Sequence, residues 1–156
     1  MTTFEKVAES NRIEGITREP TTEELVEHDR IMALKELTIG DLENFVAVYQ
    51  RNARLRVHPR MNVRVGSYVP PKGGEHIREM LGALLDDING ERIDAWNAHI
   101  QYESLHPFAD GNGRSGRVIY HWQTRNSLMA DLGFLHAFYY QTLRNYQTPP
   151  KSPRGS

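Results

Sequence analysis

The chain contains no cysteine among its 156 residues and no long run of apolar residues. The absence of cysteine excludes disulfide bonds, thiolate zinc sites and cysteine nucleophiles. The absence of an apolar run excludes a transmembrane helix, which needs about 20 such residues in succession. The first residues, MTTFEKVAESNRIEG, are charged and lack the apolar core of a signal peptide. These features predict a soluble, unexported protein of the cytoplasm.

An excess of charge of either sign is also absent. The chain has 19 lysine and arginine residues against 20 aspartate and glutamate residues, which gives a formal net charge of -1. It therefore lacks the overall positive field that draws proteins to nucleic acids. We expect neither nucleic acid nor a membrane as partner, and any anion site must be local. The length indicates a single domain with a core of its own.

The hydrophobic pattern predicts a mostly α-helical fold. Neither an internal repeat nor a series of strands that could form a sheet core is present in the sequence. Apolar residues recur at helical spacing in the segments 21–39, 40–55, 74–90, 92–108, 112–129 and 134–147.

The segment RVHPRMNVRVGSYVPP, residues 56–71, breaks this helical pattern. It combines β-forming residues, such as Val65 and Tyr68, with prolines and a glycine that exclude a long helix. We therefore expect a short, exposed β-hairpin here.

Polar residues typical of a chemical site gather in LHPFADGNGRSGR, from Leu105 to Arg117. Proline biases the residue before it away from helix, so His106 is expected where a buried helix gives way to a loop. The glycines that follow can adopt positive φ, and the loop leads directly into another helix. Such a turn presents backbone N–H groups at the positive end of a helix dipole, which is an anion-binding arrangement.

The side chains around this loop suit a nucleotide. Two guanidinium groups one helical turn apart, on Arg114 and Arg117, match a polyphosphate better than a single carboxylate. Asp110 could hold a Mg²⁺ ion that bridges phosphate oxygens. A neutral His106 could accept a proton from an attacking hydroxyl group. Taken singly, these residues also fit a plain connection, a solvated face or a helix cap, while a zinc site on His106 and Asp110 lacks a third ligand.

In this order the residues resemble the signature of the Fic domain family, His-Pro-Phe-x-Asp/Glu-Gly-Asn-Gly-Arg-x-x-Arg, at every fixed position. The resemblance extends from about Ala53 to Tyr146. It implies a Fic-type helical bundle with a short β-hairpin flap. Members typically transfer AMP from ATP to a hydroxyl group of a target protein. Gly113 stands where members that phosphorylate with ATP carry lysine, and transfer of phosphocholine is not excluded.

The resemblance also implies a role for each matching residue. His106 resembles the general base and Asp110 the Mg²⁺ ligand. The residues that resemble the phosphate-binding loop and the ligands of the outer phosphates are Gly111, Asn112, Gly113, Arg114 and Arg117.

The amino-terminal stretch SNRIEG, from Ser10 to Gly15, resembles the family's inhibitory motif, Ser/Thr-x-x-x-Glu-Gly/Asn. The resemblance implies that Glu14 reaches Arg117 and occupies the space of the γ-phosphate. The alternative is an ordinary exposed glutamate near a fraying terminus. The expected organisation is an inhibitory segment at 1–20, a catalytic domain at 21–147 and a disordered tail at 148–156.

Two further expectations rest on position within the family pattern. The first is that the flap aligns a target segment by main-chain pairing, through Val65, Gly66, Ser67 and Tyr68. The alternative is a surface hairpin without a partner. The second is that Tyr139 and Tyr140 lie near the adenine pocket, although packing in the core suits at least one of them.

Together the sequence predicts a protein adenylyltransferase that uses ATP and Mg²⁺, modifies a Ser, Thr or Tyr hydroxyl group and is autoinhibited by Glu14. One alternative is removal of AMP by the same site. Another is a toxin-like nucleotide-binding interaction module. The target protein is not specified by the sequence, and assembly into a homo-oligomer stays open.

Overall fold

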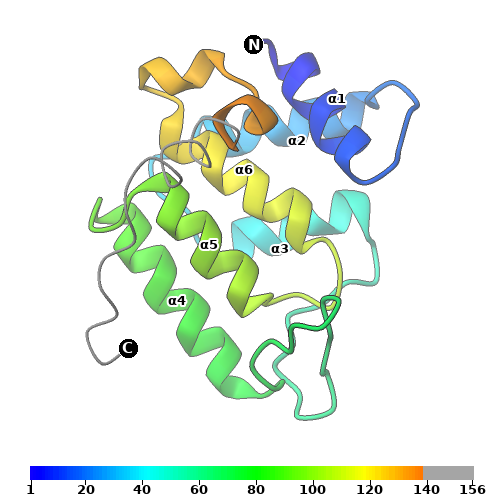
Figure 1. Ribbon diagram of the computed structural model, residues 1–156, viewed down its shortest axis with the longest axis vertical. Helices are drawn as coiled ribbons and strands as arrows, with labels where there is room; N and C mark the ends of the chain where they lie inside the picture. The colour runs from blue at the N-terminus through cyan, green and yellow to red at the C-terminus, as the bar shows by residue number, and fades with distance from the viewer. Residues whose placement is uncertain (139–156) are drawn as a thin grey trace.

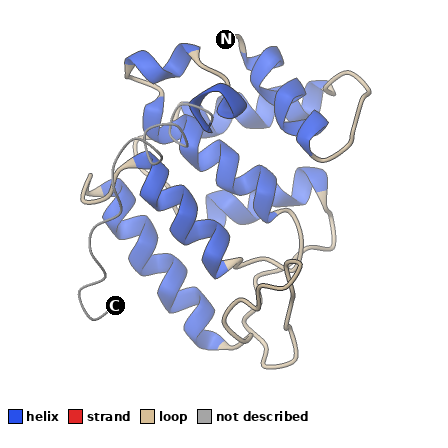
Figure 2. Ribbon diagram, in the orientation of Figure 1, coloured by secondary structure: helices blue, strands red, loops and turns tan. Residues whose placement is uncertain are grey.

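Helices form most of the described part of the chain, residues 1–138 of the computed structural model (Figures 1 and 2). A further helix begins at Phe134 and is described as far as residue 138. The mostly α-helical fold expected from the sequence is confirmed, whereas the predicted tail at 148–156 lies outside the described residues. The named elements are α1 (Thr3–Ile13), α2 (Thr22–Met32), α3 (Ile39–Tyr49), α4 (Glu75–Asn89), α5 (Ala95–Leu105), α6 (Asn112–Thr124) and the short 3₁₀ helix η1 (Leu128–Asp131).

Threonine caps define where the first three helices begin. The side chains of Thr2, Thr21 and Thr38 each accept a hydrogen bond from the backbone N–H group at the third helical position. In each case the acidic side chain at that third position accepts one from the backbone N–H group of the threonine. This reciprocal arrangement satisfies N–H groups that a helix terminus leaves unpaired.

Helix α6 is the centre of the bundle. It contacts α1, α2, α3 and α5, and α4 packs on the other side of α5 (Figure 1). The core between these helices contains Leu42, Leu81, Tyr102 and Ile119, which are completely buried. Almost every residue of α6 is buried, including the polar ones. The polar residues at its amino-terminal end are therefore held by packing on several sides.

The hairpin expected between residues 56 and 71 is not confirmed, because the described residues contain no strand there. Val65 and Tyr68 instead form an isolated antiparallel bridge around a two-residue turn. Each donates its N–H group to the carbonyl oxygen of the other, and both hydrogen bonds are 2.9 Å long. Pro70 and Pro71 follow almost at once and lack N–H groups, so the ladder cannot continue.

Within residues 1–138, no helix combines the length and the apolar character that crossing a membrane requires.

Candidate active site

His106 lies at the point where α5 ends and the loop to α6 begins. Its backbone has φ 50 and ψ 61, in the left-handed region that residues other than glycine seldom adopt. The helix thus ends before Pro107, as the sequence predicted. Burial lowers the pKa of the His106 imidazole, although the nearby carbonyl group of Glu103 opposes this effect. The ring is therefore mostly neutral at pH 7 and can accept a proton.

The loop after His106 is ordered by Asn112. The carboxamide oxygen of Asn112 accepts a hydrogen bond of 2.9 Å from the backbone N–H group of Phe108. Its nitrogen donates one of 2.8 Å to the carbonyl oxygen of the same residue. Because this side chain is buried and occupied, Asn112 can contact a ligand only through its backbone.

The amino terminus of α6 is open to an anion. Gly111 precedes it with φ 85, and a Cβ atom there would lie 2.9 Å from Cγ1 of Val46, so glycine is required on both counts. No side chain of the described residues caps this helix. The N–H groups of its first turn and the positive end of its dipole can therefore bind phosphate oxygens.

The two signature arginines have different surroundings. The guanidinium carbon of Arg114 lies 4.6 Å from the centre of the Tyr49 ring, in a cation–π contact with α3. Its side chain is buried there, and its Nε atom has no hydrogen-bond partner among the described residues. The sequence placed Arg114 beside Arg117 over the phosphate site. Arg114 thus packs against α3, whereas Arg117 contacts Ser10 and Glu14.

Arg117 is joined to α1. Its Nε atom donates a hydrogen bond of 2.8 Å to Oγ of Ser10, and Nη2 lies 3.2 Å from Oε2 of Glu14. The same carboxylate oxygen lies 3.3 Å from the position that a Cβ atom of Gly113 would take. The side chain of Glu14 is 36% exposed, whereas that of Arg117 is 7% exposed. The acidic side chain of Glu14, which directly follows α1, thus lies over the first turn of α6.

Asp110 is the acidic group at the mouth of this site. It is exposed, and its Oδ1 atom accepts a hydrogen bond of 2.8 Å from the N–H group of Gly111. Residues 1–138 contain no cluster of three or more histidine, aspartate or glutamate side chains that could enclose a metal ion. A single carboxylate still fits Mg²⁺, which is commonly held by one or two carboxylates, substrate phosphates and water.

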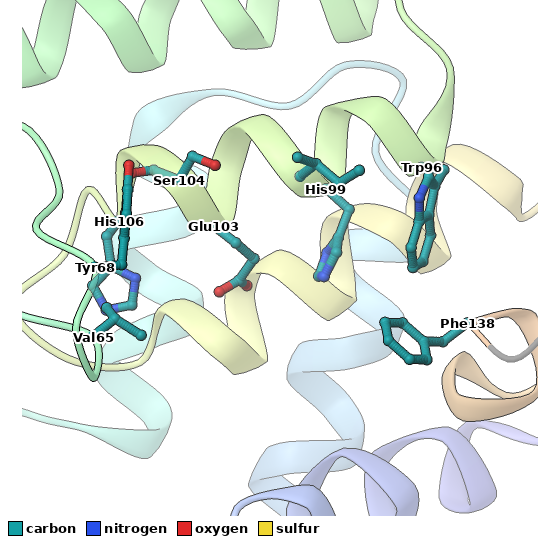
Figure 3. Close-up of a pocket in the computed structure, with 9 residues that line it drawn as sticks. Val65, Tyr68, Trp96, His99, Glu103, Ser104, His106 and Phe138 are labelled. Atoms are coloured by element: carbon teal, nitrogen blue, oxygen red, sulfur yellow. The ribbon is translucent and has the colours of Figure 1, made fainter. Parts of the chain in front are cut away.

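A pocket of about 350 Å³ extends from His106 along α5 (Figure 3). Val65, Tyr68 and His106 lie at one end of it, and Trp96 and Phe138 lie at the other (Figure 3). The hydroxyl group of Tyr68 donates a hydrogen bond of 2.7 Å to the carbonyl oxygen of Ser104, on α5. The bridged turn therefore forms one wall of the pocket.

Glu103 provides an acidic group within this largely apolar pocket (Figure 3). Burial raises the pKa of the Glu103 carboxyl group to about 7, an effect that the positive charge of Arg117 opposes. Its Oε1 atom is buried without a hydrogen-bond partner among the described residues. A Cβ atom at Gly116 would overlap that oxygen, so the glycine makes room for the carboxyl group.

Arg56 connects the turn after α5 to the bridged segment. Its side chain is completely buried, and it donates to the carbonyl oxygens of His106 at 2.6 Å and Leu105 at 2.9 Å. It also donates to those of Met61 at 3.1 Å and Pro71 at 2.8 Å. One guanidinium group thus fixes the backbone of the histidine and both ends of the segment that walls the pocket.

The sequence model of the Fic/DOC family matches residues 25–124. That stretch is more than half of the 156 residues and includes the motif from His106 to Arg117. The chain belongs to the Fic/DOC family. The family match begins after α1, so the contacts of Ser10 and Glu14 with Arg117 are observations of this structure alone.

Most of the site residues that the sequence predicted in this Fic/DOC chain meet at the amino terminus of α6. His106, Asp110 and the glycines surround it, and Glu14 reaches it from α1. Tyr139 and Tyr140 lie outside the described residues. The sequence did not single out Arg56, Tyr49 or Glu103, because each acquires its contacts only through folding.

Arg56 offers a test of how the Fic/DOC loop is held. We expect Arg56→Met to lower the free energy of unfolding by about 3 kcal/mol and the Tm by roughly 10 °C, since it leaves carbonyl groups without donors. Arg54→Met is the matched control, because Arg54 is exposed and donates only to its own neighbourhood. Thermal unfolding followed by circular dichroism makes the comparison. Equal Tm values for the two variants would contradict the role assigned to Arg56.

Proposed function

We propose that this Fic/DOC protein transfers AMP from ATP to a Ser, Thr or Tyr hydroxyl group of a target protein, and that Glu14 restrains it. The observation that carries the proposal is the position of His106. It lies between the uncapped amino terminus of α6, which suits phosphates, and a pocket of about 350 Å³ with aromatic walls. A nucleotide placed across these two regions has its α-phosphate beside the imidazole.

In this arrangement the triphosphate lies on the first turn of α6. The N–H groups of that turn bind phosphate oxygens, and Arg117 neutralises the γ-phosphate once Glu14 has moved away. The aromatic rings of Trp96 and Phe138 provide stacking surfaces for the base at the far end of the pocket. The nucleotide is thus fixed at both ends, which orients its α-phosphorus.

His106 accepts the proton of the target hydroxyl group while the hydroxyl oxygen forms a bond to the α-phosphorus. The bond from that phosphorus to the bridging oxygen breaks, and pyrophosphate leaves. Bound Mg²⁺, held by Asp110, would supply positive charge for the departing phosphates. The uncapped N–H groups of α6 stabilise the negative charge on the phosphate oxygens during transfer.

The target segment is proposed to lie along the bridged turn. Val65, at the turn beside His106, is 43% exposed, and Tyr68 is 46% exposed. Main-chain pairing with the remaining N–H and carbonyl groups of this turn would align a substrate hydroxyl group with the imidazole. The pairing is necessarily short, because Pro70 and Pro71 follow.

The position of the isotope in labelled ATP distinguishes transfer of AMP from phosphorylation. We expect the Glu14→Gly protein to become labelled by ATP that carries the isotope on its α-phosphate and not by ATP labelled on its γ-phosphate. Intact mass spectrometry should show one adenylyl group per modified site. Label from the γ-phosphate would instead indicate phosphorylation. Absence of both labels, on the protein itself and on proteins of a cell lysate, would overturn the proposed transfer.

Removal of AMP from a modified target is a second candidate, favoured by the position of Glu14. Its partly exposed carboxylate lies over Gly113, where it could orient a water molecule toward a bound phosphate. A target carrying AMP distinguishes the two activities. Release of AMP by the unaltered protein, lost in Glu14→Gln, would favour removal, whereas gain of AMP by a fresh target in the same variant would favour addition.

A further inference from the structure

Glu9, on α1, joins that helix to the helix that begins at Phe134. The Oε1 atom of Glu9 accepts a hydrogen bond of 2.6 Å from the backbone N–H group of Phe134, and the contact is partly buried. The other oxygen lies close to Gly133, where a Cβ atom would be only 2.5 Å from it. Both carboxylate oxygens of Glu9 thus lie against the backbone at the start of the helix that begins at Phe134.

A carboxylate in this position stabilises the helix that it contacts. The first N–H groups of a helix have no partner within the helix, and the helix dipole places positive charge there. An acidic side chain that accepts one of these N–H groups acts as an amino-terminal cap. Here the cap is supplied by a different helix, α1.

The capped helix carries part of the pocket wall. The ring of Phe134 is 7% exposed, and its centre lies 4.9 Å from that of His99. One turn later, the ring of Phe138 lines the pocket, with its centre 5.5 Å from that of Trp96 (Figure 3). The position of this aromatic wall therefore depends on where the helix begins.

We propose that Glu9 is a positioning residue for the nucleotide: by capping the helix from Phe134, it holds the aromatic end of the pocket in place. The inference rests on the proposed function, since it takes that pocket as the site of the base. It gives α1 two opposite effects. Glu14 obstructs the phosphate site, while Glu9 supports the nucleoside site.

This double role separates two ways of activating the protein. Replacing Glu14 removes the obstruction and leaves the cap intact. Removing all of α1 removes both the obstruction and the cap. The truncated protein should therefore be released from inhibition, but it should bind ATP less tightly than the Glu14 variant does. Glu9 and Glu14 are about 7.5 Å apart along a helix axis, so the partly exposed side chain of Glu14 can turn away from Arg117 while the Glu9 contact persists.

The test uses the full chain with Glu14→Gly, in which the phosphate site is free. Isothermal titration calorimetry with ATP and Mg²⁺ measures binding, and initial rates of AMP transfer give KM and kcat. We expect Glu9→Ala to weaken ATP binding about fivefold and to raise KM by the same factor, with little change in kcat. Glu9→Gln should restore most of the affinity, because its carboxamide oxygen can accept the same hydrogen bond.

Two further variants separate the cap from general destabilisation. Gly133→Ala should weaken ATP binding like Glu9→Ala, since its methyl group displaces the carboxylate, and the double variant should be no weaker than either single one. Glu23→Ala, which removes an exposed carboxylate from α2, should bind ATP like the parent. Hydrogen–deuterium exchange should be faster at residues 134–138 in Glu9→Ala and unchanged in α4, α5 and α6.

Equal ATP affinity in Glu9→Ala and its parent would overturn the inference. It would also be overturned if the losses of ATP affinity caused by Glu9→Ala and Gly133→Ala were additive in the double variant. If the Glu14→Gly protein binds ATP but transfers no AMP, the proposed function fails while the binding comparison still decides the role of Glu9. If that protein binds no ATP at all, both proposals are overturned.

Discussion

Replacing His106 with asparagine should lower the rate of AMP transfer roughly 10³-fold while ATP binding stays close to that of the parent protein. Asparagine tolerates the left-handed backbone that this position requires, with φ 50, better than alanine does. It cannot, however, accept a proton as an imidazole can. We expect His106→Ala to lose transfer as well, with a small additional loss of stability. Both variants are best measured in the Glu14→Gly background.

The pH profile provides an independent measure of the same residue. Because burial lowers the pKa of His106 from the ordinary value of 6.5, the imidazole is deprotonated, and so active as a base, above that pH. The contribution of His106 to kcat/KM should therefore be lost as the pH decreases below 6.5 through the lowered pKa of its imidazole. If His106→Asn transferred AMP at a rate near that of the parent protein, the assignment of His106 as the general base would be wrong.

Replacing Glu14 should raise self-modification about tenfold. The carboxylate makes a charge-assisted contact with Arg117, and its 36% exposure to solvent limits the contribution to about 1.5 kcal/mol. Glu14→Gln tests the charge alone, because the amide keeps the shape of the side chain. Glu14→Gly also adds backbone freedom next to Gly15 and should activate more. Incorporation of α-labelled AMP over time makes the measurement.

Replacing Ser10 provides a control for the Glu14 prediction, because it removes a weaker contact with the same arginine. Its hydroxyl oxygen accepts the Nε–H group of Arg117, and Ser10→Ala removes only that neutral acceptor. We expect a smaller increase than for Glu14→Gln, since hydrogen bonds between charged partners are stronger. Activity of Glu14→Gln at or below that of the unaltered protein would contradict autoinhibition by Glu14.

The sequence predicted those parts of the site that depend on neighbours in the chain. Pro107 marked the end of α5 at His106, and the glycines marked the turn into α6. These features are local, because proline geometry and glycine freedom act on adjacent residues. The helical segments followed from apolar spacing for the same reason, and a helix forms in each of those between residues 21 and 129, whereas the segment 134–147 is described only as far as residue 138.

Contacts between distant segments were not predictable in this way. Arg56 lies among several arginines, and only the folded chain brings the carbonyl groups of His106 and Pro71 to its side chain. The spacing of Arg114 predicted that it lies near Arg117, but not that its guanidinium group packs on the ring of Tyr49 from α3. The expected hairpin lacked a third strand or a sheet to support it, so only one bridge formed.

The covalent continuity of α1 with the rest of the chain has a kinetic consequence. Glu14 and Arg117 belong to one polypeptide, so their association is unimolecular and cannot be reversed by dilution. The short stretch from Gly15 to Thr21 fixes a high effective concentration of the carboxylate at the guanidinium group. In the proposed mechanism, release of Glu14 therefore depends on a ligand that binds Arg117 more tightly than the carboxylate does, and the γ-phosphate of ATP would compete for that cation at every expression level.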